Sequence, residues 1–273
     1  MNLTRHQTKQ GARWAKDGAY LPPSLTLGAL LELPRERMLD LLGTLPPGEK
    51  AVDELLAPID PQREVWAAGV TYLRSRDARR TESTVADLYD RVYAAARPEL
   101  FFKASGWRVV GTGMSIRIRA DSRWNVPEPE LVCVINHQGE IVGYCAGNDV
   151  SSRDIEGENP LYLPQAKVYD GSCALGDGIL LCAVSEISRV PIRLKIERGS
   201  VTVFEGETTT ANMKRTLSDL ADNLTRELSF PQGVFLMTGT GIVPGDGFTL
   251  QADDVVTIQV GSLRIENRVA SNS

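Results

Sequence analysis

The stretch PEPELVCVINHQGEIVGYCAGNDVSSRD, residues 127–154, decides how the middle of this chain folds. Two apolar runs, Glu130–Ile135 and Ile141–Ala146, flank the polar pentapeptide Asn136–Glu140, which contains a glycine. Short apolar runs joined by a Gly-containing turn predict an antiparallel hairpin. We therefore expect a hairpin whose first strand, from Leu131 onward, is buried.

Two carboxylates mark the start of this hairpin. Side chains two residues apart on an extended chain point to the same side, so Glu128 and Glu130 would share one face. Asp149, at the end of the paired strand, could supply a third carboxylate. Acidic side chains entering a core need a counterion or a shared proton, and three carboxylate oxygens suit Mg²⁺, Mn²⁺ or Ca²⁺. The alternative is a solvated strand end with ordinary acidic residues.

Three further residues could carry chemistry. Arg153 could grip a carboxylate through its planar guanidinium, or pair with a neighbouring acidic residue. Lys167, in the segment QAKVYDG, could act as a base in a dry pocket near a metal, or it could be solvated. Thr240 lies in Thr238–Gly241, which suits an anion or a carbonyl group but also an ordinary turn.

The composition excludes several classes of protein. The chain has 273 residues, 42% of them hydrophobic and 24% charged, which is typical of globular proteins. We expect no membrane helix and no signal peptide, and the net charge of −5 argues against nucleic acid as the main partner. The two histidines, His6 and His137, disfavour a multi-histidine zinc or iron site. The four cysteines form no CxxC pair, so we expect a cytoplasmic protein without disulfides.

The chain divides near residue 60, where a proline-rich first part ends. We expect residues 1–60 to form a small N-terminal domain and residues 61–273 to form the catalytic domain. Hydrophobic spacing predicts helices over Arg35–Leu42, Thr84–Ala96 and Thr216–Leu228.

Strands dominate the second part. Besides the hairpin, we expect strands over Glu64–Val70, Glu99–Ala104, Met114–Arg119, Gly178–Val184, Ile192–Ile196, Val201–Glu205, Phe235–Thr238, Asp254–Val260 and Leu263–Ile265. Many strands with few helices favour an α+β or mostly-β fold. The lack of regular βαβ alternation argues against a doubly wound sheet or a TIM barrel.

Taken together, these motifs resemble those of the fumarylacetoacetate hydrolase family. The set E-x-E, ND-x-[ST]-x-R, lysine and TGT occurs in order within residues 127–154, QAKVYDGSCALGDGILL (165–181) and TGTGIVPGDGF (238–248). The resemblance covers about residues 64–268. It implies a mixed β-sandwich roll with peripheral helices, commonly assembled as a homodimer. The segments RPELFFKA (97–104) and IEGENPLYLPQAKVYDGSCALG (155–176) resemble a narrower group, the 2-keto-3-deoxy-D-arabinonate dehydratases.

The resemblance also implies roles for individual residues. A divalent metal, Mg²⁺ in the first place, would be held by Glu128, Glu130 and Asp149. Lys167 matches the family's catalytic lysine, and Thr240 matches the threonine that contacts the substrate. Glu99 and Lys103 are the two candidates for protonating a leaving hydroxyl group.

One departure from the family pattern bears on the reaction. The hydrolases of the family carry a water-activating histidine in an N-Y-x-x-H-x-x-E motif, whereas residues 71–75 read TYLRS here, with Ser75 in its place. We therefore expect elimination rather than hydrolysis. We also expect Ser75 and Arg153 among the substrate-binding residues.

The resemblance implies that the reaction is dehydration of 2-keto-3-deoxy-D-arabinonate or D-xylonate to 2,5-dioxopentanoate, in oxidative pentose catabolism. The cation would grip the C1 carboxylate and the C2 ketone. Two alternatives are a C–C hydrolase or decarboxylase of diketo acids in the same family, and a non-catalytic protein that binds a metal or a keto acid.

Overall fold

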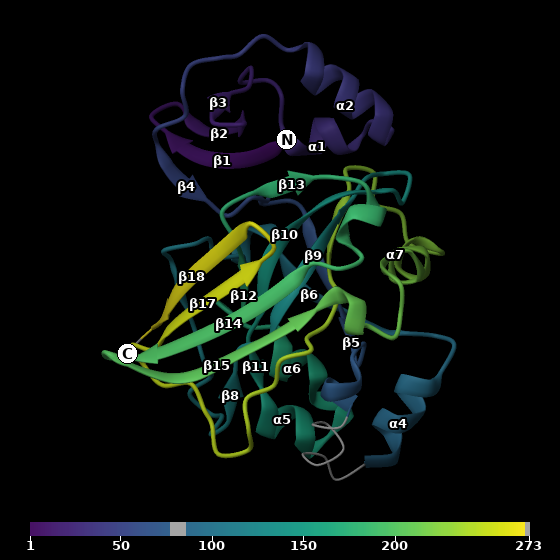
Figure 1. Cartoon of the computed structure of the whole chain (residues 1–273), viewed down its shortest axis with the longest axis vertical. Coiled ribbons are helices and arrows are strands. Elements are labelled where there is room, and N and C mark those ends of the chain that lie inside the picture. The colour runs from purple at the N-terminus through teal and green to yellow at the C-terminus, as the bar shows by residue number, and fades with distance from the viewer. Residues whose placement is uncertain (77–85, 271–273) are drawn as a thin grey trace.

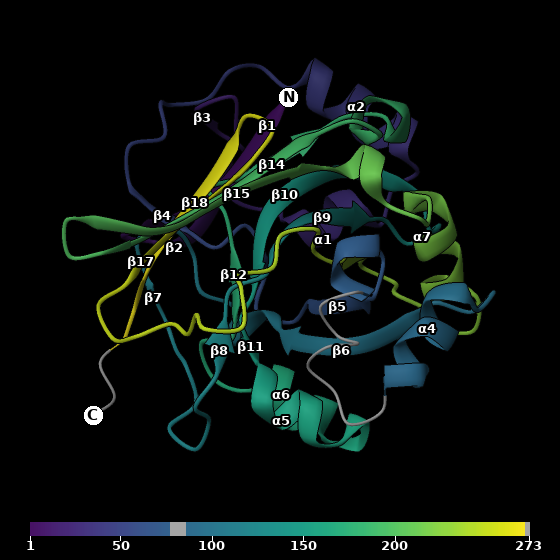
Figure 2. The ribbon, with the colours of Figure 1, turned by 60° about the horizontal axis from the view of Figure 1, so that its bottom comes forward.

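The computed structural model describes residues 1–76 and 86–270. Within these ranges the chain folds into two large sheets and one small one, and helices pack on the outside (Figures 1 and 2). No helix in the described part of the chain is long and apolar enough to cross a membrane.

The larger sheet contains the central hairpin and the N-terminal strands. Its order is β3-β2-β1-β13-β10-β9-β16-β5-β6, with β4 paired to β1 and β12 paired to β10. The strands are β1 (Asn2–Thr8), β2 (Gly11–Lys16), β3 (Ala19–Tyr20), β4 (Glu54–Leu56), β5 (Glu64–Gly69), β6 (Glu99–Ser105), β9 (Pro129–Ile135), β10 (Ile141–Asp149), β12 (Cys173–Leu175), β13 (Ile179–Leu181) and β16 (Val234–Met237).

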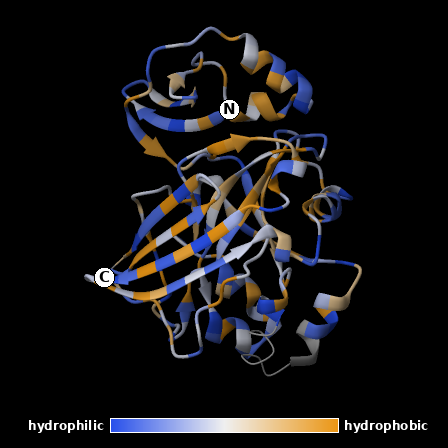
Figure 3. Cartoon of the chain, in the orientation of Figure 1, coloured by the Kyte–Doolittle hydropathy of each residue, from blue (hydrophilic) through white to orange (hydrophobic). Residues whose placement is uncertain are grey.

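The second sheet covers one side of the first. Its order is β15-β14-β17-β18-β7, and a two-stranded sheet joins β8 to β11. These strands are β7 (Ser115–Ile116), β8 (Asn125–Val126), β11 (Ser151–Ser152), β14 (Pro191–Arg198), β15 (Val201–Thr209), β17 (Val255–Val260) and β18 (Leu263–Val269). Hydrophobic and hydrophilic residues alternate along β14 and β17, which is the pattern of a sheet with one buried face (Figure 3).

The helices are short and lie at the periphery. The α-helices are α1 (Leu27–Leu31), α2 (Arg35–Thr44), α4 (Ala86–Ala94), α5 (Arg153–Glu158), α6 (Leu163–Lys167) and α7 (Leu217–Thr225), and the 3₁₀ helices are η1 (Gly106–Arg108), η2 (Pro160–Tyr162), η3 (Val184–Ile187) and η4 (Thr210–Asn212). Helices α5 and α6 lie together at the bottom of Figure 1, beside β11.

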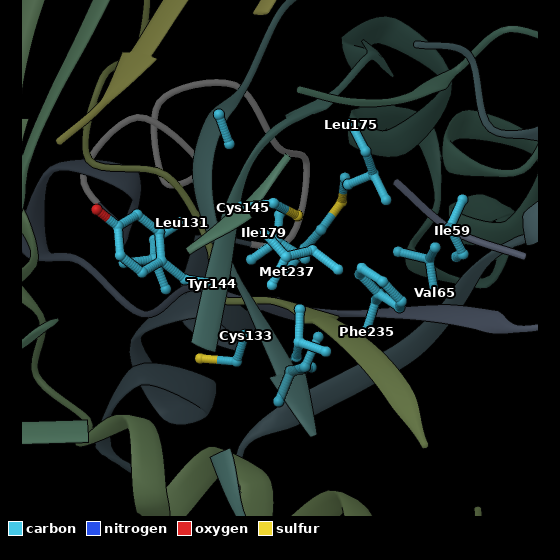
Figure 4. Close-up of a cluster of buried hydrophobic side chains, with 14 of the residues drawn as sticks. Ile59, Val65, Leu131, Cys133, Tyr144, Cys145, Leu175, Ile179, Phe235 and Met237 are labelled. Carbon is cyan, nitrogen blue, oxygen red and sulfur yellow. The ribbon is translucent and has the colours of Figure 1, made fainter. Parts of the chain in front are cut away.

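The predicted hairpin is confirmed and lies in the middle of the larger sheet. Strand β9 pairs antiparallel with β10, and every residue of both strands is buried. Strands β16 and β13 extend the sheet on either side. Leu131, Phe235 and Met237 belong to the resulting apolar core (Figure 4). The free thiols of Cys133 and Cys145 lie in the same core, where burial raises the pKa of Cys145 well above its usual range.

The other predicted strands are found with shifted ends, and one is much shorter than expected. The predicted strand Met114–Arg119 is a strand only at Ser115–Ile116. The Arg117 N–H donates to Gly171 O, and Met114 O accepts from the Asn267 amide, so neither group is available for a strand ladder. Residues 84 and 85 of the predicted helix Thr84–Ala96 lie outside the described residues, and α4 covers Ala86–Ala94.

The four strands in residues 1–60 were not expected from the sequence. The prolines of this segment favour irregular structure, but they lie outside β1 to β4. Strand β1 pairs antiparallel with β13, with Leu3 opposite Ile179, so the N-terminal segment extends the larger sheet. The division into two domains at residue 60 stays a prediction.

The substitution Leu3→Ala measures how firmly this segment is joined to the rest. Leu3 is fully buried in the common core. We therefore expect the free energy of unfolding to fall by about 2–5 kcal/mol, the usual cost of truncating a core leucine. Urea unfolding followed by tryptophan fluorescence measures the change. The control Val52→Ala, at a position 76% exposed, should leave the midpoint within about 0.5 kcal/mol. Equal midpoints for the two variants would contradict the packing described here.

Candidate active site

Three buried carboxylates meet where the central hairpin ends. Glu128 precedes β9, Glu130 lies in it, and Asp149 closes β10. The Asp149 N–H donates to Glu128 O at 3.0 Å, which joins the two strand ends. One carboxylate oxygen from each residue lies within 4.8 Å of the others, and all three residues are almost fully buried. The cluster that the residue spacing predicted is therefore present.

Two buried lysines neutralise part of this charge. Lys167 Nζ, at the end of α6, donates to Glu128 Oε2 and to Asp149 Oδ2, each at 3.0 Å, and to Ser151 Oγ at 2.6 Å. Lys103 Nζ forms an ion pair with Asp149 Oδ1 at 2.5 Å and donates to Lys167 O at 2.5 Å. The alternative of a solvated Lys167 is thereby excluded, since its side chain is buried among acceptors.

A β-bulge aims Lys103 at this cluster. In the pairing of β5 with β6, Val65 lies opposite Ala104 and Trp66 lies opposite Phe102, so the register skips Lys103. A bulged residue has no cross-strand partner and its side chain can be redirected. The fully buried Lys103 therefore reaches Asp149 instead of continuing the alternation of the strand.

Further hydrogen bonds hold Glu128 and Glu130 in place. Arg153 Nη2, at the start of α5, donates to Glu128 Oε1 at 3.0 Å. The Gly239 N–H donates to Glu130 Oε2 at 2.6 Å. Arg153 therefore pairs with Glu128, a carboxylate of the protein, and its predicted contact with the substrate stays a prediction. These contacts fix the carboxylate orientations and leave lone pairs for a cation, because an ionised carboxylate offers about four acceptor positions.

Burial makes Glu130 harder to ionise. Desolvation, followed by the nearby charges of Asp149 and Glu128, raises the pKa of Glu130 well above its usual value. The Lys167 ammonium and the Gly239 N–H oppose this shift without cancelling it. A divalent cation among these oxygens would relieve the same repulsion.

A small cavity opens on the cluster. Its volume is about 20 Å³, and it is lined by Ala68, Gly69, Val70, Ser75, Glu99, Phe101, Glu128, Asp149, Glu156, Lys167, Gly239 and Thr240. Room for about one water molecule or bare ion requires roughly 10–15 Å³ on this measure. The cavity therefore admits an ion beside the carboxylates.

The donor type fits a hard divalent cation. The carboxylates of Glu128 and Asp149 line the cavity, and a carboxylate oxygen of Glu130 lies within 4.8 Å of theirs. Carboxylate oxygens are the ligands that Mg²⁺ prefers, and no histidine or cysteine lines the cavity among the described residues.

The structure brings most of the predicted site residues to this cavity. Ser75, Glu99, Lys167 and Thr240 line it, as do two of the three ligand candidates. Lys103 and Arg153 instead bond the carboxylates from outside the cavity lining. The Ser75 hydroxyl donates to Tyr72 O at 2.8 Å and accepts from the Tyr72 N–H at 3.3 Å.

Sequence reasoning did not assign Gly69, Phe101, Ser151 or Glu156 to the site. Ser151 and Glu156 lie in the polar stretch that follows β10, so their proximity to Asp149 along the chain was a usable signal. Gly69 and Phe101 carry no such signal, because they reach the cavity only through the pairing of β5 with β6. The Lys167 ammonium lies 5.7 Å from the centre of the Phe101 ring, within cation–π range.

A strained backbone residue directs the chain over the cavity. Val70 has φ of +54°, which is rare for a β-branched residue and costs of order 1–3 kcal/mol. The chain turns here from β5 into the segment that carries Ser75. The Thr71 hydroxyl then donates to Thr238 O at 2.6 Å, which ties this segment to the TGT motif. A strained residue held by its surroundings is common at functional sites.

Comparison with known proteins identifies the family. Residues 65–270 match the profile described as fumarylacetoacetate (FAA) hydrolase C-terminal. The chain belongs to the fumarylacetoacetate hydrolase family. The mixed-sheet architecture predicted for this family is thereby confirmed, and the carboxylate cluster described above corresponds to the E-x-E and ND motifs that suggested it.

Two curated relatives within this family are sugar-acid dehydratases. The chain is 47% identical over 204 residues to a probable 2-keto-3-deoxyxylonate dehydratase of Haloferax volcanii, covering 74% of this chain and 70% of the relative. It is 43% identical over 212 residues to the 2-dehydro-3-deoxy-D-arabinonate dehydratase of Saccharolobus solfataricus, covering 76% and 70%.

Solved structures of the family agree with these relatives. A 2-keto-3-deoxy-D-arabinonate dehydratase complexed with magnesium and 2,5-dioxopentanoate superposes with a TM-score of 0.84 at 32% identity, covering 100% of this chain and 99% of that one. A fumarylacetoacetate hydrolase from Exiguobacterium antarcticum, at 22% identity and a TM-score of 0.73, shares the fold. The donor set here and the magnesium in the dehydratase complex support Mg²⁺ as the cofactor.

Glu128→Gln tests the cation site directly. The amide keeps the size of the side chain but removes a charged ligand, so we expect Mg²⁺ affinity to fall by more than about 100-fold, beyond the usual loss for an outer-shell partner. Isothermal titration calorimetry measures the affinity, and the rise of Tm with Mg²⁺ gives a second readout. Glu207→Gln, on the exposed face of β15, is the matched control and should bind Mg²⁺ as the wild type does. Unchanged affinity in Glu128→Gln would refute the site.

Proposed function

We infer that this protein dehydrates a 2-keto-3-deoxy pentonate, D-arabinonate or D-xylonate, to 2,5-dioxopentanoate. The observation that carries the inference is the buried carboxylate cluster with Lys167 beside it, at a cavity where Ser75 stands in the place of the water-activating histidine. The relatives named above act on substrates of this kind. The same observation disfavours hydrolysis of a diketo acid, because the Ser75 hydroxyl is already bonded to the Tyr72 backbone.

Lys167 is the proposed base. Its Nζ is buried at the cavity wall, within 3.0 Å of two of the carboxylates that would hold the cation. When bound, a divalent cation would supply a Lewis acid that polarises the 2-keto group. In its neutral form Lys167 takes a proton from C3, which the adjacent ketone makes acidic.

Glu99 is the proposed acid. Of the two candidates, Glu99 lines the cavity, whereas Lys103 bonds Asp149 and the Lys167 carbonyl from outside the lining. We therefore assign protonation of the leaving C4 oxygen to Glu99 and positioning of Asp149 and Lys167 to Lys103. The C3–H and C4–O bonds break, a C3–C4 double bond forms, and water leaves.

The remaining steps move protons within the product. The Glu99 carboxylate, which gave up its proton in the elimination, takes a proton from C5, and Lys167 returns its proton to C3, so the double bond shifts to C4–C5 and both groups regain their starting state. The resulting enol then becomes the C5 aldehyde. Thr240 and Ser75, on the walls of the cavity, are proposed to contact the carboxylate and hydroxyl groups of the substrate. Arg153 is proposed to act on the substrate indirectly, by orienting Glu128.

We further propose that the protein works in the cytoplasm as a homodimer in pentose catabolism. Four buried cysteines that are all free suit a reducing compartment. The homodimer follows from the resemblance to the family, and light scattering coupled to size-exclusion chromatography measures the assembly.

Turnover by Lys167→Met separates catalysis from binding. Wild-type protein with Mg²⁺ and 2-keto-3-deoxy-D-arabinonate should consume the acid and release 2,5-dioxopentanoate, measured by chromatography of both compounds. Lys167→Met should lose about 10²- to 10⁴-fold in kcat, the usual contribution of a positioned base, and still bind Mg²⁺.

Lys195→Met is the control, at a half-buried lysine of β14 that does not line the cavity, and it should keep wild-type turnover. The proposed function would be refuted if the wild type hydrolysed an acylpyruvate and did not dehydrate the 2-keto-3-deoxy acid. Metal and keto-acid binding without any turnover would favour a binding protein.

A further inference from the structure

Gly69 and Glu99 form the last residue pair between β5 and β6, at the wall of the cavity. A Cβ atom placed on Gly69 would lie 2.0 Å from Glu99 Oε2 and 2.6 Å from Glu99 Cδ. Non-bonded carbon atoms prefer separations of about 3.5–4.0 Å. The Glu99 carboxylate therefore occupies the space that any side chain at position 69 would need.

The backbone does not explain this glycine. Gly69 is absent from the residues with positive φ, so its conformation is open to other amino acids. Glycine also weakens a strand, because it contributes no side chain to packing. The close approach of the Glu99 carboxylate is the feature that requires the missing Cβ.

The atoms nearest to a Cβ on Gly69 are those of Glu99. The three nearest atoms to the placed Cβ all belong to the Glu99 side chain, and two of them are at its far end. A methyl group here would leave the backbone in place and turn the carboxylate away. Gly69 is the last residue of β5 that pairs with β6. The next residue, Val70, has a left-handed backbone and does not continue the pairing.

We propose that Gly69 is a positioning residue for Glu99. Its bare backbone lets the carboxylate fold over the end of β5 and holds it at the cavity wall, on the side where the C4 oxygen of the substrate would leave. The catalytic part of this proposal rests on the proposed function, in which Glu99 is the acid. The geometric part rests on the distances between Gly69 and Glu99.

A double-mutant cycle tests the coupling. We compare Gly69→Ala, Glu99→Ala and the double variant by kcat, KM and Mg²⁺ affinity. Gly69→Ala should lower kcat by nearly the same factor as Glu99→Ala, about 10²- to 10⁴-fold, with KM and Mg²⁺ affinity within about twofold of the wild type. The double variant should match Glu99→Ala, because removing the carboxylate makes room for the methyl group.

Two results of this cycle would overturn the proposal. One is wild-type kcat in Gly69→Ala. The other is an equal loss of kcat from Gly69→Ala with and without the Glu99 carboxylate, which would mean that the methyl group disturbs the fold. Gly43→Ala is the control, since a Cβ there meets no atom within 4 Å, and it should keep wild-type kinetics.

Crystal structures of the wild type and of Gly69→Ala keep the test independent of turnover. We expect the Glu99 carboxylate to leave its place over position 69 while Lys167 and Glu128 stay in theirs. An unmoved carboxylate would overturn the proposal. If the wild type turns over no 2-keto-3-deoxy acid, the proposed function fails, and the displaced carboxylate still decides the role of Gly69.

Discussion

The need to compensate three buried carboxylates organises the active-site half of this molecule. Glu128, Glu130 and Asp149 stand at the end of a hairpin whose strands are wholly buried. Burying ionised carboxylates in such a place destabilises the fold unless opposite charges or hydrogen bonds compensate them. Here the compensating groups come from several parts of the chain outside the hairpin, and Lys167 bonds two of the three carboxylates.

The compensating groups also shape the cavity. Lys167 comes from α6, Lys103 from a bulge in β6, and the Gly239 N–H from the loop after β16. Because Lys103 bonds the carbonyl of Lys167 as well as Asp149, the two lysines are fixed relative to each other. The groups that hold the charge thereby set the position of the proposed base before any substrate arrives, which is the preorganisation that catalysis requires.

Neither of the two histidines lies near the carboxylate cluster. His6 is buried in the N-terminal segment, where Nδ1 bonds Asp53 O at 2.8 Å, and His137 is exposed at the tip of the hairpin. Neither lies at the cavity. Ser75, at the position of the family's histidine, uses its hydroxyl to close a turn with Tyr72. Among the described residues, the titratable groups that line this cavity are therefore carboxylates and one lysine, which suit proton transfer to and from a substrate.

Local patterns were enough to predict the hairpin and the carboxylate cluster. Strand alternation places Glu128 and Glu130 on one face, and a short turn makes Asp149 their neighbour, so adjacent residues carry that information. Lys167 and Thr240 were already candidates from the local sequence, and the resemblance to a family added Glu99 and assigned all three to one site, which local spacing could not do. The strands of residues 1–60 were missed, because their pairing with β13 depends on residues far along the chain.

The amino-acid sequence by itself determined the donor type of the site and the absence of the usual histidine, since both are properties of residue identity. Only the tertiary structure decided which residues face the cavity. It placed Glu99 on the wall, against Gly69, and turned Lys103 behind Asp149, although both belong to one strand. The physical reason is that both effects need a second strand. A bulge exists only relative to a paired strand, and the missing Cβ of Gly69 makes room for a carboxylate only because the neighbouring strand brings that carboxylate there.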